Sequence, residues 1–330
     1  MAVTILDVAK RVGVTMTTVS KVLNNKPSGL KISQATRAKI FEAAQALTYR
    51  PSFSARALAR GKTFSLGFIC GDIHTPYYAE LASKALKAAE TRGYHLVMSL
   101  TEWNFQKERD CLDLLLGGKV DGVFMVAGGL QPGTSQYEYV LEKKFPVVIS
   151  NAKIPGLSCV RNDWTPGMEQ AVGHLKRSGY DRILFVGYPL PPPLADTKNQ
   201  AFEQACGIHQ VQGSLQTVTS NLNDARELGI RLAGEPARPS ALIAYSDYIA
   251  TGLISGLREG GLDVPRDMKV IGIDGTEMGQ FYHPPLTTIT GNIEKHARTT
   301  VDLLVNLIEK PEMEPQEIIL ATELIVRKSA

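Results

Sequence analysis

TILDVAKRVGVTMTTVSKVLN, residues 4–24, decides how the fold of this chain begins. Thr4 is placed to cap a helix, with Asp7 three residues later to complete a capping box. Gly13 stands where such a helix would end in the left-handed conformation, which glycine adopts without strain. Thr15 is then the natural N-cap of a second helix that runs to the end of the stretch. The spacing predicts helix, tight turn, helix.

The second predicted helix has two contrasting faces. Val19, Val22 and Leu23 share its inner side, as expected for a helix packed on a small core. The outward residues are small, polar or cationic: Met16, Thr17, Ser20, Lys21 and Asn24. A third helix is predicted to start at Ser33, behind Ile32, and to continue through Leu47 until Pro51 stops it. Three short helices around one small core predict a DNA-reading module.

Charge is distributed unevenly along the 330 residues. Residues 1–62 contain eleven Lys and Arg against Asp7 and Glu42, a net charge of +9, whereas the remainder carries 25 basic and 31 acidic residues, a net charge of −6. A strongly basic segment attracts polyanions by counterion release, although an ordinary solvated basic surface would have the same composition. The two parts of the chain are expected to have different partners.

Four segments carry a family resemblance: residues 5–9 (ILDVA), 13–15 (GVT), 18–24 (TVSKVLN) and 49–51 (YRP). Together they resemble the headpiece signature of the LacI/GalR family of bacterial repressors. The resemblance implies that some side chains face base edges in the major groove, namely Met16, Thr17 and Lys21, and that others lie near phosphates, namely Thr15, Thr18, Ser20 and Asn24. Tyr49 belongs to the same DNA-binding set. Residues 25–31 look longer than the turn that is usual in the family.

Residues 51–62 are predicted to be a hinge. Two turns of helix could follow Pro51, but so short a helix is marginal on its own in water. In the family this stretch becomes helical on DNA and a leucine wedges into a base step of the minor groove; Ala55 and Leu58 match those positions. The alternative is a simple linker between residues 1–50 and the rest of the chain.

From residue 63 onward, short apolar runs alternate with amphipathic helical patterns, which is the rhythm of parallel α/β sheets. The first set of buried strands is predicted at Ser65–Cys70, His95–Leu100, 122–127 and Val147–Ser150. A second set is predicted at Arg182–Gly187, 215–219, 241–246 and Lys269–Asp274. Two such sheets predict two lobes, with ligands bound at the carboxyl ends of the strands.

The whole chain resembles the LacI/GalR family from end to end, and residues 63–330 resemble periplasmic sugar-binding proteins. The implied fold is an all-α helix-turn-helix headpiece followed by an α/β two-lobed, periplasmic-binding-protein-like (type I) effector domain. In that fold the chain crosses between lobes near Asn162, Gly291 and Ala321. The expected N-lobe is about 63–162 plus 292–321, and the expected C-lobe is about 163–290 plus 322–330.

Candidate effector contacts follow from strand ends and from family positions. Asp72, Tyr77 and Tyr78 follow the first strand, where aromatic faces pack on a sugar ring or a base and a carboxylate accepts hydrogen bonds. Asp274 ends a strand, and the alternative for it is a helix cap. The family positions add Asp163, Trp164, Lys198, Ser246 and Asp247. Lys198 stands where an arginine is usual and Trp164 where an asparagine is usual, with plain pocket wall as the alternative for Trp164.

These features predict a sequence-specific transcription regulator, most simply a repressor, controlled by a small effector. A sugar or sugar acid is favoured and a purine-like effector comes second. Palindromic double-stranded operator DNA requires two headpieces, so a homodimer is expected. No signal peptide or spanning segment is seen, which favours a cytoplasmic protein without a membrane partner. The alternative is a sugar-binding or sensing module without a specific DNA target.

Catalysis, metal binding and a cofactor are not expected. GxSxG, GxxxxGK[ST] and HExxH motifs are absent, so no nucleophile elbow, phosphate loop or zinc helix is indicated. The four cysteines, Cys70, Cys111, Cys159 and Cys206, stand singly, which suits buried reduced thiols better than a disulfide framework or a zinc site.

Overall fold

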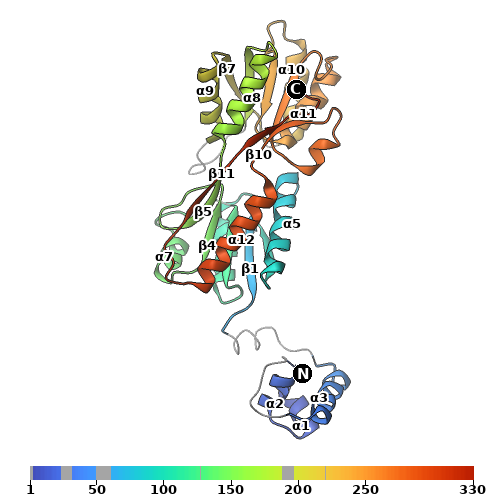
Figure 1. Cartoon of the computed structure of the whole chain (residues 1–330), viewed down its shortest axis with the longest axis vertical. Helices are drawn as coiled ribbons and strands as arrows, with labels where there is room; N and C mark the ends of the chain where they lie inside the picture. The colour runs from blue at the N-terminus through green and yellow to red at the C-terminus, as the bar shows by residue number, and fades with distance from the viewer. Residues whose placement is uncertain (1–2, 24–31, 50–60, 127, 188–196, 220) are drawn as a thin grey trace. The chain divides into compact units, whose positions relative to one another are not determined.

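The computed structural model describes residues 3–23, 32–49, 61–126, 128–187, 197–219 and 221–330. The chain divides into two compact units, Met1–Thr63 and Phe64–Ala330 (Figure 1). Each unit has its own buried apolar core.

The first unit consists of α1 (Ile5–Val12), α2 (Met16–Leu23) and α3 (Gln34–Ala46). The predicted capping box is present, because Asp7 Oδ2 accepts from the Thr4 backbone N–H at 2.9 Å. Gly13 ends α1 in the left-handed conformation with φ 74°, as predicted. The helices meet through seven buried residues: Val8, Ala9, Val19, Val22, Ile40, Ala43 and Ala44.

The third helix ends earlier than predicted, and Pro51 does not stop it. Thr48 takes a left-handed conformation with φ 51°. Its N–H donates to Gln45 O at 3.0 Å, and the Tyr49 N–H donates to Ala44 O at 2.8 Å. This pair of bonds is the Schellman closure of a helix. The helix therefore ends at Ala46 and Leu47 is its cap.

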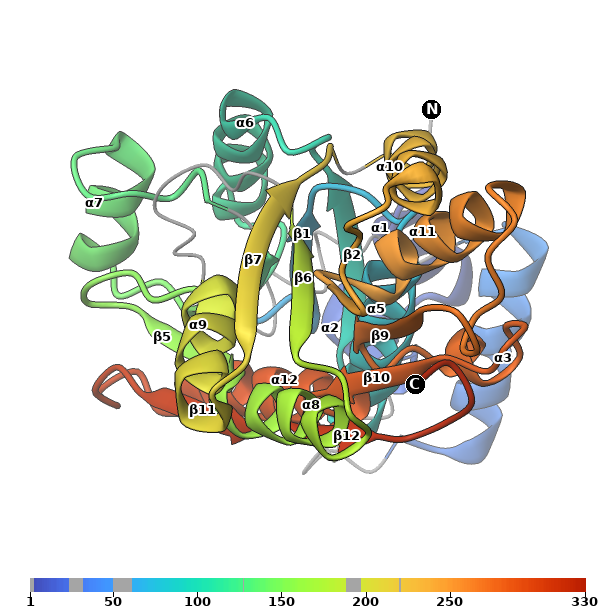
Figure 2. The same cartoon turned by 90° about the horizontal axis from the view of Figure 1, so that it is seen from above.

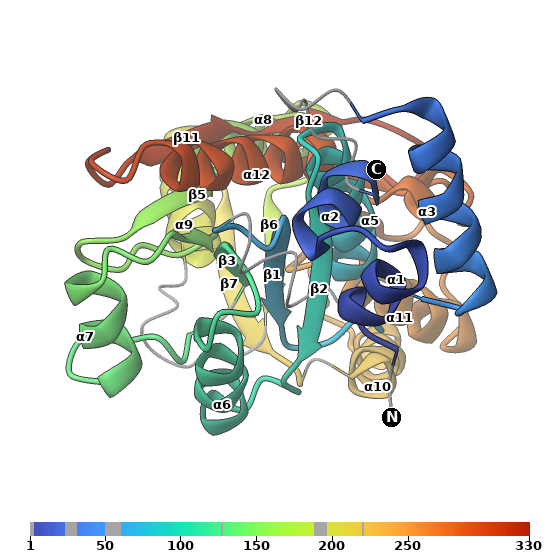
Figure 3. The same ribbon diagram turned by 90° about the horizontal axis from the view of Figure 1, so that it is seen from below.

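The second unit contains two six-stranded sheets. The first has the order β11-β5-β4-β3-β1-β2 and is parallel throughout. Its strands are β1 (Ser65–Cys70), β2 (His95–Leu100), β3 (Gly122–Val126), β4 (Val147–Ser150), β5 (Ser158–Asp163) and β11 (Glu317–Ala321). One face packs on α5 (Pro76–Thr91) and α12 (Ile293–Glu309), and the other on α6 (Phe105–Leu116) and α7 (Ser135–Glu142), as Figure 3 shows.

The second sheet has the order β12-β10-β9-β8-β6-β7, and only β12 runs antiparallel to its neighbour. Its strands are β6 (Arg182–Gly187), β7 (Gln212–Thr217), β8 (Ala241–Ala244), β9 (Lys269–Asp274), β10 (Thr287–Thr290) and β12 (Glu323–Ile325). The helices α8 (Thr165–Arg177) and α9 (Thr197–His209) cover one face, and α10 (Leu222–Gly234) and α11 (Asp247–Glu259) cover the other (Figure 2). A short 3-10 helix, η1 (Glu277–Gln280), follows β9.

The observed strands differ from the predicted ones at several positions. β7 begins at Gln212, three residues before the predicted 215–219, because its side chains are largely exposed and form no apolar run. β8 ends at Ala244, since Ser246 already caps α11. β5, β10, β11 and β12 were not among the predicted strands.

The chain passes between the two sheets three times within the second unit. The first crossover leads from β5 to α8, the second from β10 to α12, and the third from β11 to β12. Each lobe is therefore built from separate stretches of sequence. Among the described residues, none of the helices has the length and apolar character needed to span a bilayer.

Candidate nucleic-acid interface and ligand site

The N-terminal turn of α2 presents hydroxyl groups to solvent. Thr15 caps the helix, since its Oγ1 accepts from the Thr18 N–H at 3.2 Å and lies 2.9 Å from Thr18 Oγ1. Met16 beside it is 49% exposed. Thr17 is exposed and Lys21, one turn later, is half-buried. The face predicted to meet base edges therefore carries hydroxyls, one thioether and one ammonium group.

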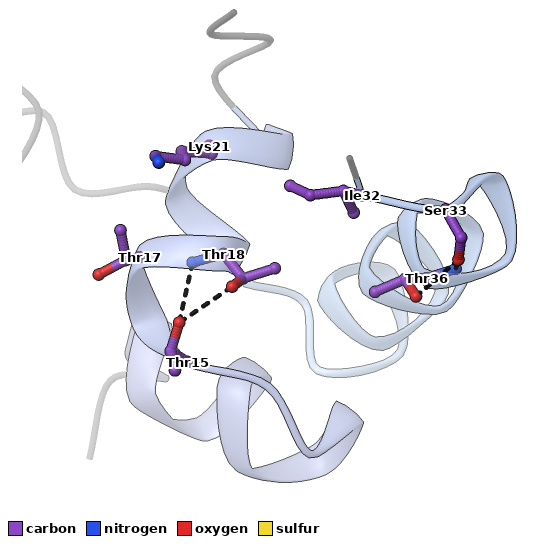
Figure 4. A pocket seen from close by; sticks show the side chains of 7 residues that line it. All are labelled: Thr15, Thr17, Thr18, Lys21, Ile32, Ser33 and Thr36. Carbon is purple, nitrogen blue, oxygen red and sulfur yellow. Dashed lines mark hydrogen bonds between the residues drawn. The ribbon is translucent and has the colours of Figure 1, made fainter. Parts of the chain in front are cut away.

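A shallow pocket lies between the starts of α2 and α3 (Figure 4). Its lining combines residues from both helices: Thr15, Thr17, Thr18, Lys21, Ile32, Ser33 and Thr36. Ser33 caps α3, and its Oγ accepts from the Thr36 N–H at 3.1 Å. Two helix N-termini, with their partial positive charge, and Lys21 thus contribute to one pocket, a combination that suits a phosphate group. Ser33 was predicted as a helix cap but not as part of this surface.

The remaining predicted DNA contacts fall in two groups. Ser20 is half-buried on α2, and Tyr49 packs half-buried against the core of the first unit. Asn24, Ala55 and Leu58 lie outside the described residues.

In the second unit, Lys198 on α9 is surrounded by aromatic and acidic groups. Its Nζ donates to Tyr245 O at 2.8 Å and lies 3.6 Å from Asp274 Oδ1. The same ammonium group stands 4.6 Å from the Trp164 ring centroid and 4.0 Å from that of Tyr245. An ion pair and two cation–π contacts hold this buried cation in place. Tyr245 was not among the predicted contacts.

Asp274 at the end of β9 is both buried and strained. Its φ of 129° lies in the region that favours glycine, and such strain persists where the surrounding structure imposes it, often at functional sites. The carboxyl group also accepts a hydrogen bond from the backbone of Asp247, the first residue of α11, so Asp274 contributes to capping that helix as well. Burial raises the pKa of its carboxyl group, and the neighbouring Lys198 opposes that rise.

A second cluster follows β1. Asp72 Oδ1 accepts from the backbone N–H groups of His74 and Thr75, and its Oδ2 accepts from Trp103 Nε1 at 2.7 Å. The Trp103 ring lies 5.0 Å from that of Tyr78, which is 5.1 Å from Tyr77. Trp103 was missed because it stands in a loop, outside any periodic pattern. Its indole N–H satisfies one oxygen of the predicted ligand residue Asp72.

The two clusters approach each other across the lobes. The negative charge of Asp274 is close enough to add to the rise in the Tyr77 pKa, which burial dominates. Nearby, Glu80 Oε2 on α5 accepts from the Glu277 N–H of η1 at 3.0 Å. The structure therefore brings Tyr77, Lys198, Trp164 and Asp274 into one neighbourhood.

Three predicted ligand residues have internal partners. Asp163 Oδ1 accepts from the Thr165 N–H at 3.0 Å. Ser246 Oγ caps α11 by accepting from the Ile249 N–H at 3.1 Å. Asp247 is 1% exposed, and it accepts from Thr276 and, at 2.6 Å, from the Thr288 hydroxyl. Asp247 thus holds the loop after β9 in place, and its carboxylate does not face solvent in this conformation.

Comparison with known proteins agrees with this architecture. Residues 4–52 match the family model "Bacterial regulatory proteins, lacI family", and residues 172–330 match a periplasmic binding protein-like domain. Catabolite control protein A of Priestia megaterium is 30% identical over 339 residues, covering 100% of this chain and 99% of that protein. The ribose operon repressor of Escherichia coli K12 is 29% identical, with 99% of each chain covered.

A solved structure gives the same result for the fold. The lac repressor dimer bound to operator and the anti-inducer ONPF superposes with a TM-score of 0.86 at 23% identity, covering 100% of this chain and 99% of that one. The fold expected from the sequence, a helix-turn-helix headpiece followed by a two-lobed periplasmic-binding-protein-like domain, is confirmed. This chain belongs to the lacI family of bacterial regulatory proteins.

Proposed function

We propose that this chain is a cytoplasmic, dimeric repressor whose affinity for a palindromic operator is set by a sugar or sugar derivative bound between its lobes. The observation that carries the proposal is the joint presence of the α2 surface and the Lys198–Asp274 cluster in one chain. A sugar-sensing module without a DNA target would have no use for an exposed hydroxyl-rich helix on a unit of net charge +9.

Each part of the α2 surface has a role in reading DNA. Lys21 donates to guanine O6 or N7, Thr17 hydrogen-bonds a base edge, and Met16 offers apolar contact to a thymine methyl. The pocket hydroxyls and the N-terminus of α3 hold a phosphate, which fixes the register of the helix in the groove without reading sequence. Lysine supplies a point charge, whereas the guanidinium group of arginine offers two parallel N–H donors. Discrimination at this base pair is therefore weaker than arginine would give.

The acidic character of the ligand site favours a neutral sugar over a sugar acid. The charge of Lys198 is already balanced by Asp274, whose Oδ1 lies 3.6 Å from its Nζ, and the predicted contacts include two further carboxylates, Asp72 and Asp163. Carboxylates accept hydrogen bonds from vicinal hydroxyls, and the ring of Trp164 provides an apolar face for a sugar ring. A purine-like effector is the second candidate, because the same aromatic faces would stack on a base.

A homodimer accounts for an exposed apolar edge on the first sheet. Val97 and Met98 on the edge strand β2 are 41% and 45% exposed, and Leu100 is 44% exposed. Leu86 on the adjacent α5 is 42% exposed. An open apolar edge strand promotes association unless it is covered. A second copy seated here would also supply the second headpiece.

The DNA half of the proposal is tested by selection from a random pool of duplex DNA with the full-length protein, with and without ribose, lactose and cellobiose. Enrichment of a palindrome with two half-sites is expected. Full-length Lys21→Glu serves as the matched control and should enrich nothing. If the parent enriches no sequence under any of these conditions while its binding to one of the sugars is measurable, the sensing-module alternative is correct.

A further inference from the structure

Polar side chains at the carboxyl ends of β4 and β5 form one connected hydrogen-bond chain. Asn151 Nδ2 donates to Tyr77 Oη at 2.9 Å, and Asn151 Oδ1 accepts from the Asn162 N–H at 3.4 Å. Asn162 Oδ1 lies 3.4 Å from His296 Nδ1, and His296 Nε2 lies 2.8 Å from Ser150 Oγ. All members except Asn151, which is half-buried, are at most 8% exposed.

The donor and acceptor roles along this chain are fixed. Burial lowers the pKa of His296 to about 4, so its imidazole is neutral near pH 7 and has one N–H. Asn162 Oδ1 can only accept, which places that proton on Nδ1. His296 Nε2 must then accept from the Ser150 hydroxyl. A neutral buried network with a single arrangement of protons is rigid, because any reversal would leave a polar group without a partner.

Ser150, His296 and Asn162 have the connectivity of a nucleophile, a base and an orienting group. Ser150 is only 2% exposed, however, and lies beneath the first turn of α12. A substrate has no access to its hydroxyl in this conformation. The geometry therefore points to an internal positioning role.

The chain of hydrogen bonds reaches two of the three crossovers. Asn162 lies at the end of β5, in the first crossover. A Cβ on Gly291, in the second crossover, would lie 2.5 Å from Asn162 Cγ, so the Asn162 amide rests directly against the Gly291 backbone. His296 follows in the first turn of α12. At the other end, Tyr77 stands in the first turn of α5, close to Asp274.

We propose that Asn162 and His296 are positioning residues that transmit the state of the ligand site, sensed at Tyr77, to the first two crossovers and so set the angle between the lobes. A ligand hydroxyl that bonds Tyr77 Oη alters the Asn151 amide, which holds the Asn162 backbone N–H, and a shift of that backbone moves the Asn162 side chain against Gly291. The crossovers are the segments about which the lobes turn. Coupling of this kind is a free energy shared by the two ends, so it must appear as non-additivity.

A double-mutant cycle on the full-length protein tests the proposal without any ligand. Tyr77→Phe removes one hydroxyl and His296→Leu removes both ring nitrogens. Amide hydrogen exchange is followed in residues 160–163 and 290–293. Tyr77→Phe should speed exchange in both segments by about threefold in the parent and have little further effect in the His296→Leu background. Equal effects of Tyr77→Phe in the two backgrounds would overturn the proposed relay from Tyr77 through Asn162 and His296 to the crossovers.

Two further variants separate relay from simple packing. His296→Gln keeps one donor and one acceptor and should restore most of the non-additivity, whereas a purely structural histidine would show no such rescue. Thr300→Val removes a buried hydroxyl on the same helix, one that donates to the His296 carbonyl at 2.8 Å without touching the ring. Its effect should simply add to that of Tyr77→Phe; a non-additive effect as large as that of His296→Leu contradicts the assignment.

The inference rests on the proposed function only for its consequence at DNA. The same cycle is repeated with affinity for the enriched palindrome as the readout, and the same non-additivity is expected. If no DNA is enriched, the proposed function fails while the exchange cycle still decides the relay. If DNA is bound specifically but the two substitutions act additively in both readouts, the relay is wrong and the proposed function stands.

Discussion

Lys21 is the only charged group among the described residues that line the pocket between α2 and α3. Asp274, in the other unit, is a buried carboxylate held in a strained conformation beside a buried cation. Both are single side chains, although replacing Asp274 also leaves the buried Lys198 without its ionic partner. They are therefore suited to tests at the scale of the residue.

Lys21→Ala should lower affinity for the selected palindrome by about 5- to 150-fold, corresponding to about 1–3 kcal/mol, and relax the preference at one base pair per half-site. The measurement is binding to a panel of single-base variants of the palindrome. Lys10→Ala, on the exposed side of α1, should weaken all panel members evenly. An unchanged preference profile in Lys21→Ala would remove this residue from the base-reading set.

Asp274→Asn should weaken binding of the effector sugar by about 10- to 150-fold, because hydrogen bonds to a charged acceptor contribute about 1.5–3 kcal/mol each. Basal DNA affinity should be retained. Calorimetric titration with ribose, lactose and cellobiose measures the first quantity, and the DNA panel measures the second. Asp181→Asn, an exposed aspartate outside the site, is the control. Equal sugar affinity of the parent and Asp274→Asn would rule out ligand contact.

His296 makes the stability of the folded chain depend on pH. Burial lowers its pKa from 6.5 to about 4, a difference that corresponds to about 3 kcal/mol. Unfolding between pH 4 and pH 6.5 is therefore accompanied by uptake of a proton on His296. The free energy of unfolding decreases as the pH falls from 6.5 to 4, and His296 causes no further change below pH 4. In urea titrations across this range, His296→Gln should flatten the decrease, whereas exposed His74→Gln should not. A profile unaltered by His296→Gln would contradict the assignment.

At the scale of the element, α10 and α11 pack unusually closely because small residues face each other. A Cβ on Gly256 would collide with the backbone oxygen of Arg226, and one on Gly252 would lie 2.7 Å from Leu222 O. The Arg226 side chain also bonds Glu259 in a bidentate manner, at 2.8 and 2.7 Å. Glycine is required here for close approach and not for a left-handed backbone.

Gly256→Ala should therefore destabilise the second unit by about 1–3 kcal/mol through overpacking. Gly207→Ala on α9 is the matched control, since a Cβ there meets nothing within 4 Å. That control should stabilise by about 0.5–1 kcal/mol, the ordinary gain from replacing a helical glycine. The measurement is the urea midpoint of each variant relative to the parent; a gain in both would mean that helix propensity, not packing, governs the site.

Elements with strong local signals could be predicted from the sequence. The caps at Thr4 and Ser33 and the left-handed Gly13 follow from short-range hydrogen bonding, so their prediction was accurate. The edge strand β7 was misplaced because exposed strands have no apolar run. In the ligand site, residue types at strand ends were predictable, but the placement of Lys198 between Trp164 and Tyr245 depends on tertiary packing that joins distant segments.

At the scale of the whole molecule, the exposed apolar edge formed by β2 and α5 predicts the assembly. Met98→Glu should convert the dimer to a monomer at micromolar concentration, since a charge in the centre of an apolar interface is left unpaired. Sedimentation velocity measures the change. Leu114→Glu, an equally exposed apolar residue on α6 (54% exposed), is the control and should remain dimeric. A dimer that survives Met98→Glu would locate the interface elsewhere.

The three crossovers also constrain how the protein can be made. Within the second unit, residues 64–163 leave the ribosome first during synthesis, yet α12 and β11 of the same lobe lie beyond residue 292. The apolar face that α12 covers therefore stays open until the other lobe has almost entirely emerged. A growing chain of this kind exposes a large apolar, aggregation-prone surface until late in translation. A premature stop codon after Thr290 would leave both lobes incomplete instead of releasing one finished lobe.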